Sequence, residues 1–185
     1  MTTISPKRLL KISKYLSYHL RHHPDKLRLK LAPGGWIEVK KLLAAAKKHK
    51  FPITQNELRY VVEQNDKQRF SFDSTGTLIR ANQGHSIKID LQLQPTIPPK
   101  ILYHGTYLGA VRAILEQGLK KMNRHHVHLS QNWHTAQKVG QRRGKAVILE
   151  IDAEKMYQEG FDFYCSDNGV WLVDAVPCQY LKQLD

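Results

Sequence analysis

Basic side chains gather near the start of the chain, in the segment Tyr18-His19-Leu20-Arg21-His22-His23-Pro24. Arginine stays charged at every working pH and offers a planar fork that fits phosphate oxygens. Histidine can donate or accept a proton near neutrality. Arg21 and His22 therefore predict an anion site in which a proton can also be moved. A simpler interpretation stays open, because cations are also favoured at a helix C-terminus, where they face the negative end of the dipole.

A helix would place Arg21 and His22 about 100° apart, so both can face one ligand only where the helix frays. Two later segments carry similar side chains. Arg69 begins an expected hairpin, and Gln83-Gly84-His85-Ser86 follows it. A glycine among amide, imidazole and hydroxyl groups lets backbone approach a phosphodiester closely. These four residues are candidate RNA contacts, although plain linkers share this composition.

The second half of the chain holds two polar groups on expected strands. His104-Gly105-Thr106 ends a strand that begins at Ile101, and strand ends are frequent ligand sites. The segment Arg124–Ser130 contains three histidines, of which His126 and His128 would share one face of a strand. Zinc is an alternative for this pair, but no carboxylate or Cys lies close in sequence to complete a site. We therefore expect no metal.

A basic turn, Gln141–Lys145, precedes an apolar stretch. The sequence leaves open whether Arg142, Arg143 and Lys145 contact a ligand or only solvent. Neither a Gly-x-Gly-x-x-Gly nor a Walker sequence occurs, so a Rossmann or P-loop nucleotide site is not supported.

Positive charge is concentrated in the first half. The 185 residues carry a net charge of +13, and residues 1–93 hold 18 Lys and Arg against 7 Asp and Glu. A phosphate polymer is the usual partner of such a surface, because binding releases counterions. A soluble basic protein without such a partner is the alternative.

The hydrophobic content of 41% is enough for a packed core and argues against disorder. No apolar run approaches the roughly 18 residues of a membrane span, and no signal peptide is recognised. We expect a cytoplasmic protein with no membrane partner, as a monomer by default. Cys165 and Cys178 are too few and too far apart for a zinc ribbon, and free thiols are favoured over a single disulfide.

The segment Leu93–Lys100 contains three prolines in five residues, which cannot continue a helix or donate to a sheet. It predicts a boundary between lobes 1–93 and 94–185. In the first lobe the pattern predicts helices at 5–22, 39–50 and 54–65, a strand at 36–39 and a hairpin at 69–80. This order is typical of a winged helix, a module that commonly binds nucleic acid.

The second lobe alternates strands and helices, so the fold class is α+β. Strands are expected from 101, at 126–129, 146–151, 161–164 and 170–173. Helices are expected at 108–117, from 130 to 139 and at 153–158, with Gly118 capping the first.

Taken together, these segments resemble the RNA 2′-phosphotransferase family. The matching pieces are YLSYHLRHHP, GGWIEV, KQRF, QGHS, LYHGT, RHHVHLS, RRGKAVILEI and NGVWL, in that order along nearly the whole chain. The resemblance implies a winged-helix-like N-terminal lobe that binds RNA and an ADP-ribosyltransferase-like C-terminal lobe that binds NAD. It also implies a role in tRNA splicing or on another RNA that bears a 2′-phosphate.

The reaction implied by the resemblance removes an internal 2′-phosphate from RNA by way of an ADP-ribosylated phosphate. The products are 2′-OH RNA, nicotinamide and ADP-ribose 1″,2″-cyclic phosphate. The family's essential set falls on Arg21, His22, Arg69 and Arg124. The cofactor contacts fall on His104, Gly105, Thr106, His128, Leu129 and Ser130. Three permanent cations would reduce repulsion between two anionic substrates, and His22 is the member able to move a proton near pH 7.

Two other functions stay open. Many ADP-ribosyltransferases carry a catalytic Glu on a later strand, and the comparable stretch Asn168–Trp171 has none. This argues against modification of proteins but leaves ADP-ribosylation of nucleic-acid phosphate ends possible. A winged-helix protein that binds nucleic acid without catalysis would explain the charge but would leave the segments around His104 and His128 without a role.

Overall fold

The computed structural model describes residues 4–64 and 68–184. The chain forms two compact units, unit 1 (Met1–Gln92) and unit 2 (Leu93–Asp185), and the division lies one residue from the boundary expected between lobes. Helices and strands occur in both units, so the fold class is α+β, as predicted. Among the described residues, no helix combines the length and the apolar character needed to cross a membrane. Both cysteines are free thiols.

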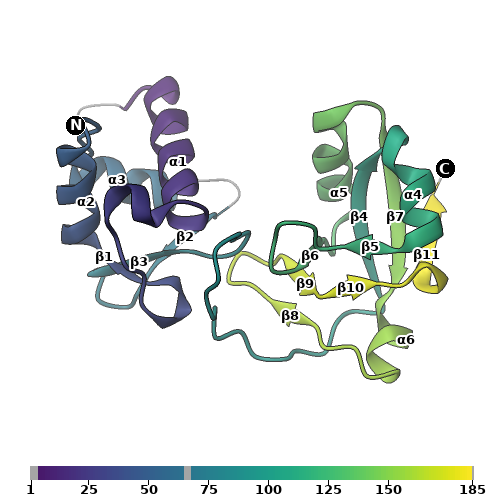
Figure 1. Ribbon diagram of the computed structural model, residues 1–185. Helices are drawn as coiled ribbons and strands as arrows, with labels where there is room; N and C mark the ends of the chain where they lie inside the picture. Colours follow the sequence, from purple (N-terminus) through teal and green to yellow (C-terminus); the bar gives the residue numbers. More distant parts are fainter. Residues whose placement is uncertain (1–3, 65–67, 185) are drawn as a thin grey trace. The chain divides into compact units, whose positions relative to one another are not determined.

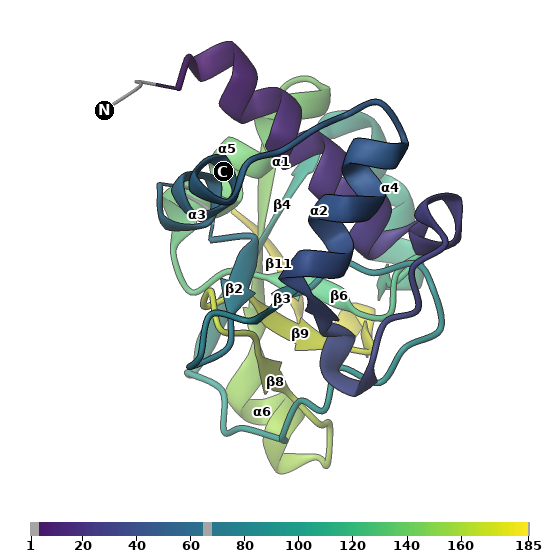
Figure 2. The ribbon, with the colours of Figure 1, turned by 90° about the vertical axis from the view of Figure 1, so that its left-hand side faces the viewer.

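Unit 1 follows the predicted order of elements. Its described elements are α1 (Pro6–Arg21), 3-10 turns at Pro24–Leu27 and Pro33–Gly35, β1 (Ile37–Glu38), α2 (Val39–Lys48), α3 (Gln55–Glu63), β2 (Phe70–Phe72) and β3 (Leu78–Ala81). Strands β1 and β2 both pair antiparallel with β3. Within this unit the three helices lie above the small sheet in both views (Figures 1 and 2). The expected end of the third helix at Asn65 falls outside the described residues.

Local signals in the sequence explain the helix ends of unit 1. Ser5 caps α1 by accepting a hydrogen bond from the backbone of Arg8 at 3.3 Å. Thr54 and Glu57 form the predicted capping box at the start of α3. At its other end α1 stops at Arg21, and His22 leaves the helical conformation with φ −126° and ψ −39°.

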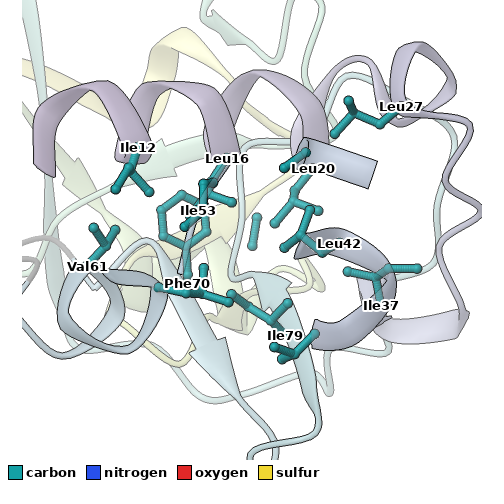
Figure 3. Close-up of a cluster of buried hydrophobic side chains, with 14 residues drawn as sticks. Ile12, Leu16, Leu20, Leu27, Ile37, Leu42, Ile53, Val61, Phe70 and Ile79 are labelled. Carbon is teal, nitrogen blue, oxygen red and sulfur yellow. The ribbon is translucent and has the colours of Figure 1, made fainter. Parts of the chain in front are cut away.

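One face of α1 fills the core of unit 1. Ile12, Leu16 and Leu20 recur every fourth residue and are fully buried. Figure 3 shows these side chains pointing from α1 toward Phe70 and Ile79 of the sheet. The opposite face of α1 is therefore left to solvent.

Unit 2 is built on short antiparallel sheets. Its described elements are β4 (Ile101–Tyr107), α4 (Leu108–Gln117), β5 (Leu119–Lys120), β6 (Val127–Leu129), α5 (Trp133–Gly140), a 3-10 turn (Gln141–Arg143), β7 (Ala146–Asp152), α6 (Ala153–Gln158), β8 (Tyr164–Cys165), β9 (Trp171–Val173), β10 (Ala175–Val176), a 3-10 turn (Cys178–Tyr180) and β11 (Leu181–Leu184). The strand orders are β11-β7-β4, β6-β9-β8 and β10-β5.

Strand β4 lies at the edge of its sheet and connects to the next sheet. Tyr103 and Ser130 exchange two backbone hydrogen bonds of 2.8 Å, which join β4 to the residue that follows β6. Helix α5 lies beside β4 and β7 in Figure 1. The segments 101–107 and 127–130, far apart in sequence, are thus held side by side.

Two expected strands differ from the structure. His104-Gly105-Thr106 does not stand at an open strand end, because β4 continues to Tyr107, which pairs with Ala146 of β7. The expected strand 161–164 is present only as Tyr164–Cys165. Its alternating aromatic residues reflect packing rather than strand pairing, since Phe163 is fully buried in the core and Phe161 packs against it.

Candidate functional site

Three separate segments of unit 1 meet at the end of α1. The Arg21 guanidinium donates from Nη2 to the backbone oxygen of Arg69 at 3.4 Å. The backbone N–H of Ser86 donates to the backbone oxygen of Arg21 at 3.0 Å. We call Arg21, His22, Arg69 and Ser86 the unit 1 group. Tertiary structure therefore brings Arg21 together with residues that lie 48 and more positions later in the sequence.

His22 is oriented by Ser86. Its Nδ1 lies 2.8 Å from the Ser86 hydroxyl, across 64 positions of sequence. Its backbone N–H still caps α1 by donating to Tyr18. Because His22 has left the helical conformation, the 100° separation that a helix would impose on Arg21 and His22 no longer applies.

A buried amide fixes the loop that carries Ser86. Asn82 is 4% exposed, and its side chain donates from Nδ2 to the Gln68 oxygen at 2.7 Å. Its backbone N–H donates to the Arg69 oxygen at 3.0 Å. Asn82 was not predicted as a site residue, because its only signal in the sequence is a polar residue directly after an apolar strand. Through these bonds Asn82 positions both the residues before the hairpin and the loop after it.

The predicted RNA contacts 83–86 differ in accessibility. Gly84 has a φ of 86° and lies against Arg21, whose Nη1 would be 3.6 Å from a Cβ at this position. Ser86 is exposed, and Gln83 is half-buried. His85 is fully buried, with its Nε2 near Gly35. Its imidazole therefore packs inside unit 1 and supports the loop, while the other three residues keep accessible atoms.

In unit 2, His104 is held by the strand beside it. Its Nδ1 lies 3.0 Å from the His128 backbone oxygen. A carbonyl oxygen only accepts, so Nδ1 carries the proton. Burial lowers the pKa of His104; the bond to the His128 carbonyl opposes this shift, and the charge of Arg124 adds to it. The ring is therefore neutral near pH 7, and Nε2 is left as a hydrogen-bond acceptor.

Arg124 contacts the side chain of His128, the residue whose backbone oxygen holds His104. Its Nη1 lies 2.9 Å from His128 Nδ1. Arginine only donates, so His128 accepts at Nδ1 and, when neutral, carries its proton on Nε2. His128 thus connects Arg124, through its side chain, to His104, through its backbone.

Two further arginines act on Arg124. Partial burial, followed by the charges of Arg143 and Arg142, lowers the pKa of the Arg124 guanidinium. Arginine does not lose its proton in proteins, so the lowered pKa reflects the cost of burying this charge and, after it, repulsion from the other two cations. Within residues 4–64 and 68–184, none of these three arginines forms an ion pair with a carboxylate. This arrangement favours an anion, and it places near Arg124 two residues whose role the sequence left open.

Close packing of two backbones explains why position 105 is a glycine. A Cβ at this position would lie 1.7 Å from the Ala136 backbone oxygen, and a Cβ at Gly140 would lie 2.5 Å from the Thr106 oxygen. The backbone of α5 therefore packs directly on that of β4 through this pair of glycines. Gly105 is required for packing whether or not it contacts a ligand.

Two other predicted cofactor contacts face the protein interior. Leu129 and Thr106 are 2% and 8% exposed, so their side chains belong to the interior. The Ser130 hydroxyl donates to the Asn132 oxygen at 2.9 Å.

Within the described part of the chain, no group of three His, Cys, Asp or Glu side chains could hold a metal ion. A small open hollow between Phe161, Tyr164 and Asp174 contains none of the predicted site residues.

Comparison with known proteins gives one consistent result. The sequence profile of the family "RNA 2′-phosphotransferase, Tpt1 / KptA family" matches residues 7–175. A protein of Nostoc punctiforme is 62% identical over 181 residues, covering 98% of this chain and 100% of its own. Proteins of Herpetosiphon aurantiacus and Streptomyces coelicolor are 54% and 51% identical, and each covers 95% of this chain and is itself covered to 96%. All three are named "Probable RNA 2′-phosphotransferase".

Proposed function

The chain belongs to the RNA 2′-phosphotransferase family, and from this we propose that it removes an internal 2′-phosphate from RNA in an NAD-dependent reaction. Bound NAD supplies an electrophilic ribose carbon with nicotinamide as leaving group, and a neighbouring ribose hydroxyl as the acceptor of the phosphorus. The products are 2′-OH RNA, nicotinamide and ADP-ribose 1″,2″-cyclic phosphate. Each residue assignment below is part of this proposal.

One observation carries the RNA side of the proposal, namely the meeting of Arg21, His22, Arg69 and Ser86 in unit 1. Arg21 and Arg69 would hold the oxygens of the 2′-phosphate, since guanidinium groups bind phosphate through paired donors. Arg124, in unit 2, is the third arginine of the family set. Permanent cations aimed at charge that develops during reaction are often the largest catalytic contribution.

His22 would handle the proton. When the ribose hydroxyl attacks phosphorus it must lose a proton, and the departing RNA 2′-oxygen must gain one. Histidine is the only side-chain type in the family set that ordinarily titrates near neutrality. The Ser86 hydroxyl, 2.8 Å from Nδ1, would orient the ring for this role. Ser86 is thus a positioning residue in this scheme.

The cofactor side would be formed by β4 and β6. The neutral His104 would accept a ribose hydroxyl at Nε2, because its Nδ1–H is already used by the His128 oxygen. Successive residues of a strand alternate the direction of their backbone groups, so Gly105 directs its N–H and C=O to the same edge as Tyr103. That edge would suit a carboxamide such as that of nicotinamide. Arg124, Arg142 and Arg143 would suit the pyrophosphate.

A single incubation tests the proposal. The protein is mixed with NAD and an RNA that bears one internal 2′-phosphate, and RNA, nicotinamide and ADP-ribose products are separated by chromatography. Release of nicotinamide together with dephosphorylated RNA and the cyclic phosphate supports the proposal. ADP-ribose left on the RNA would instead indicate a nucleic-acid ADP-ribosyltransferase. Binding of RNA without nicotinamide release would indicate a non-catalytic binder.

A further inference from the structure

The exposed face of α1 carries lysines in a single row. Lys7, Lys11 and Lys14 are all exposed. At 100° per residue, these three lysines and Tyr18 fall within about 60° of one another around the helix axis. Arg21 falls about 20° beyond this row by the same geometry. The row therefore leads along one side of the helix to the unit 1 group.

The opposite side of α1 fixes the direction of this face. Ile12, Leu16 and Leu20 point into the core of unit 1 (Figure 3). They lie about 180° from the lysines by helical periodicity. The lysine row is therefore held on the surface by the same packing that places Arg21 at the end of the helix.

A fourth lysine joins the row at Tyr18. The Lys26 ammonium donates to the Tyr18 hydroxyl at 2.5 Å and lies 5.1 Å from the centre of its ring. The His23 ring packs on Tyr18 at 4.6 Å between centres. Tyr18 thus fixes a cation from the turn after α1 beside the lysines of α1 itself. We call Lys7, Lys11, Lys14 and Lys26 the α1 lysine row.

Among the described residues, no carboxylate neutralises these charges. Arg8, which lies outside the row, donates to Glu57 from Nε at 2.7 Å and from Nη2 at 3.2 Å. By contrast, among the described residues none of the four row lysines forms an ion pair with a carboxylate. Like charges along one face of a helix repel one another. Stability of the fold therefore does not explain why these lysines share one face.

We propose that the α1 lysine row binds the backbone phosphates of the single-stranded RNA that flanks the 2′-phosphorylated nucleotide. The proposal rests on the proposed function, because the row ends at the unit 1 group, to which that function assigns the 2′-phosphate. From Lys7 to Arg21 the face is roughly 21 Å long, which is enough for several nucleotides. Lysines along such a face bind the RNA backbone without reading the base sequence.

The test compares two triple variants of equal charge. Lys7→Gln/Lys11→Gln/Lys14→Gln removes three charges of the row. Lys40→Gln/Lys47→Gln/Lys48→Gln removes three exposed charges of α2 and serves as the matched control. Two probes are used without NAD, an RNA of about twelve nucleotides with one internal 2′-phosphate and a dinucleotide with the same group. Fluorescence anisotropy gives the Kd of each probe across a range of salt concentrations.

We expect the α1 variant to bind the long RNA roughly tenfold more weakly, and the slope of log K against log salt to fall by about 2, since each single-strand phosphate contact contributes about 0.7. Its affinity for the dinucleotide and its thermal unfolding should be unchanged. The α2 control should bind both probes nearly as the unchanged protein does. Lys7→Arg/Lys11→Arg/Lys14→Arg should retain the long-RNA affinity, because the charges remain.

The proposal is overturned if both glutamine triples weaken long-RNA binding equally, because the effect would then be that of net charge. It is also overturned if the α1 triple loses no affinity, or loses as much for the dinucleotide. Nicotinamide release from the unchanged protein with the dinucleotide tests the proposed function separately. An α1-specific loss without any nicotinamide release would support the row and contradict the proposed function.

Discussion

The two units hold their proposed site residues in different ways. In unit 1, Arg21, His22, Arg69 and Ser86 lie where regular structure ends, and hydrogen bonds between distant loops hold them together. In unit 2, His104 and Gly105 lie inside a paired strand, on which α5 packs without space for one extra carbon atom. From this difference we expect that side chains of the loop-built group can be truncated without loss of the fold, whereas the backbone packing at Gly105 tolerates no added carbon atom.

The largest expected effect tests the first half of this comparison. Arg69→Ala should lower kcat by about 10²- to 10³-fold, the typical loss when a preorganised donor is removed. The Arg69 backbone oxygen would still hold Arg21, so thermal unfolding should be nearly unchanged. Arg124→Ala should behave in the same way. Nicotinamide release and a thermal melt are measured for each variant.

Arg59→Ala is the control, because Arg59 is an exposed arginine of α3 outside the unit 1 group. It should keep full activity. Full activity in Arg69→Ala would remove Arg69 from the site, and a large fall in its melting temperature would break the comparison.

The second half of the comparison predicts the largest loss of stability. Gly105→Ala should destabilise unit 2 by about 3 kcal/mol or more, because the new Cβ would meet the Ala136 backbone and not a movable side chain. Gly109→Ala in α4 is the matched control: its Cβ would meet the end of the Tyr107 side chain at 3.1 Å, and alanine favours a helix. Urea unfolding measures both. Equal stability of the two variants would contradict the packing argument.

A smaller effect is expected at the positioning residue of unit 1. Ser86→Ala should lower kcat about tenfold, with little change in KM, since the alanine cannot bond the His22 ring. The pH profile of kcat should shift, because the hydroxyl no longer contacts the titrating ring. Ser86→Thr keeps a hydroxyl and should restore most of the rate. A purely structural role would leave the pH profile unmoved.

The smallest effect concerns pH and compares one histidine in each unit. Burial is the main cause that lowers the pKa of both His19 in unit 1 and His104 in unit 2 below the ordinary 6.5. The unfolded chain then binds more protons than the folded protein, so stability is full above about 6.5 and falls as the pH drops below it. His19→Gln or His104→Gln should each reduce this fall by less than about 1 kcal/mol between pH 7.5 and 5.5.

Urea unfolding at the two pH values measures the effect. If neither substitution makes the decline shallower, these two rings are not its source. If only His104→Gln does, the acid sensitivity belongs to unit 2.

Where the sequence was sufficient, the signal was local. The α1 periodicity, the Thr54–Glu57 capping box and the helix 153–158 were predicted correctly, because each depends on residues within a few positions of one another. The order of motifs also indicated the family, which the comparisons confirm. The expected strand 161–164 was wrong because burial of aromatic side chains in a loop gives the same alternation as a strand.

Only the tertiary structure decided which of the candidate residues lie together. The bond from Arg21 to Arg69 and that from His22 to Ser86 span 48 and 64 positions, and no local pattern encodes such contacts. The full length of β4 likewise depends on pairing with β7, some forty residues later. The sequence alone determined the residue types available for phosphate chemistry. The fold decided their geometry, because long-range packing and hydrogen bonding fix distances that spacing along the chain leaves free.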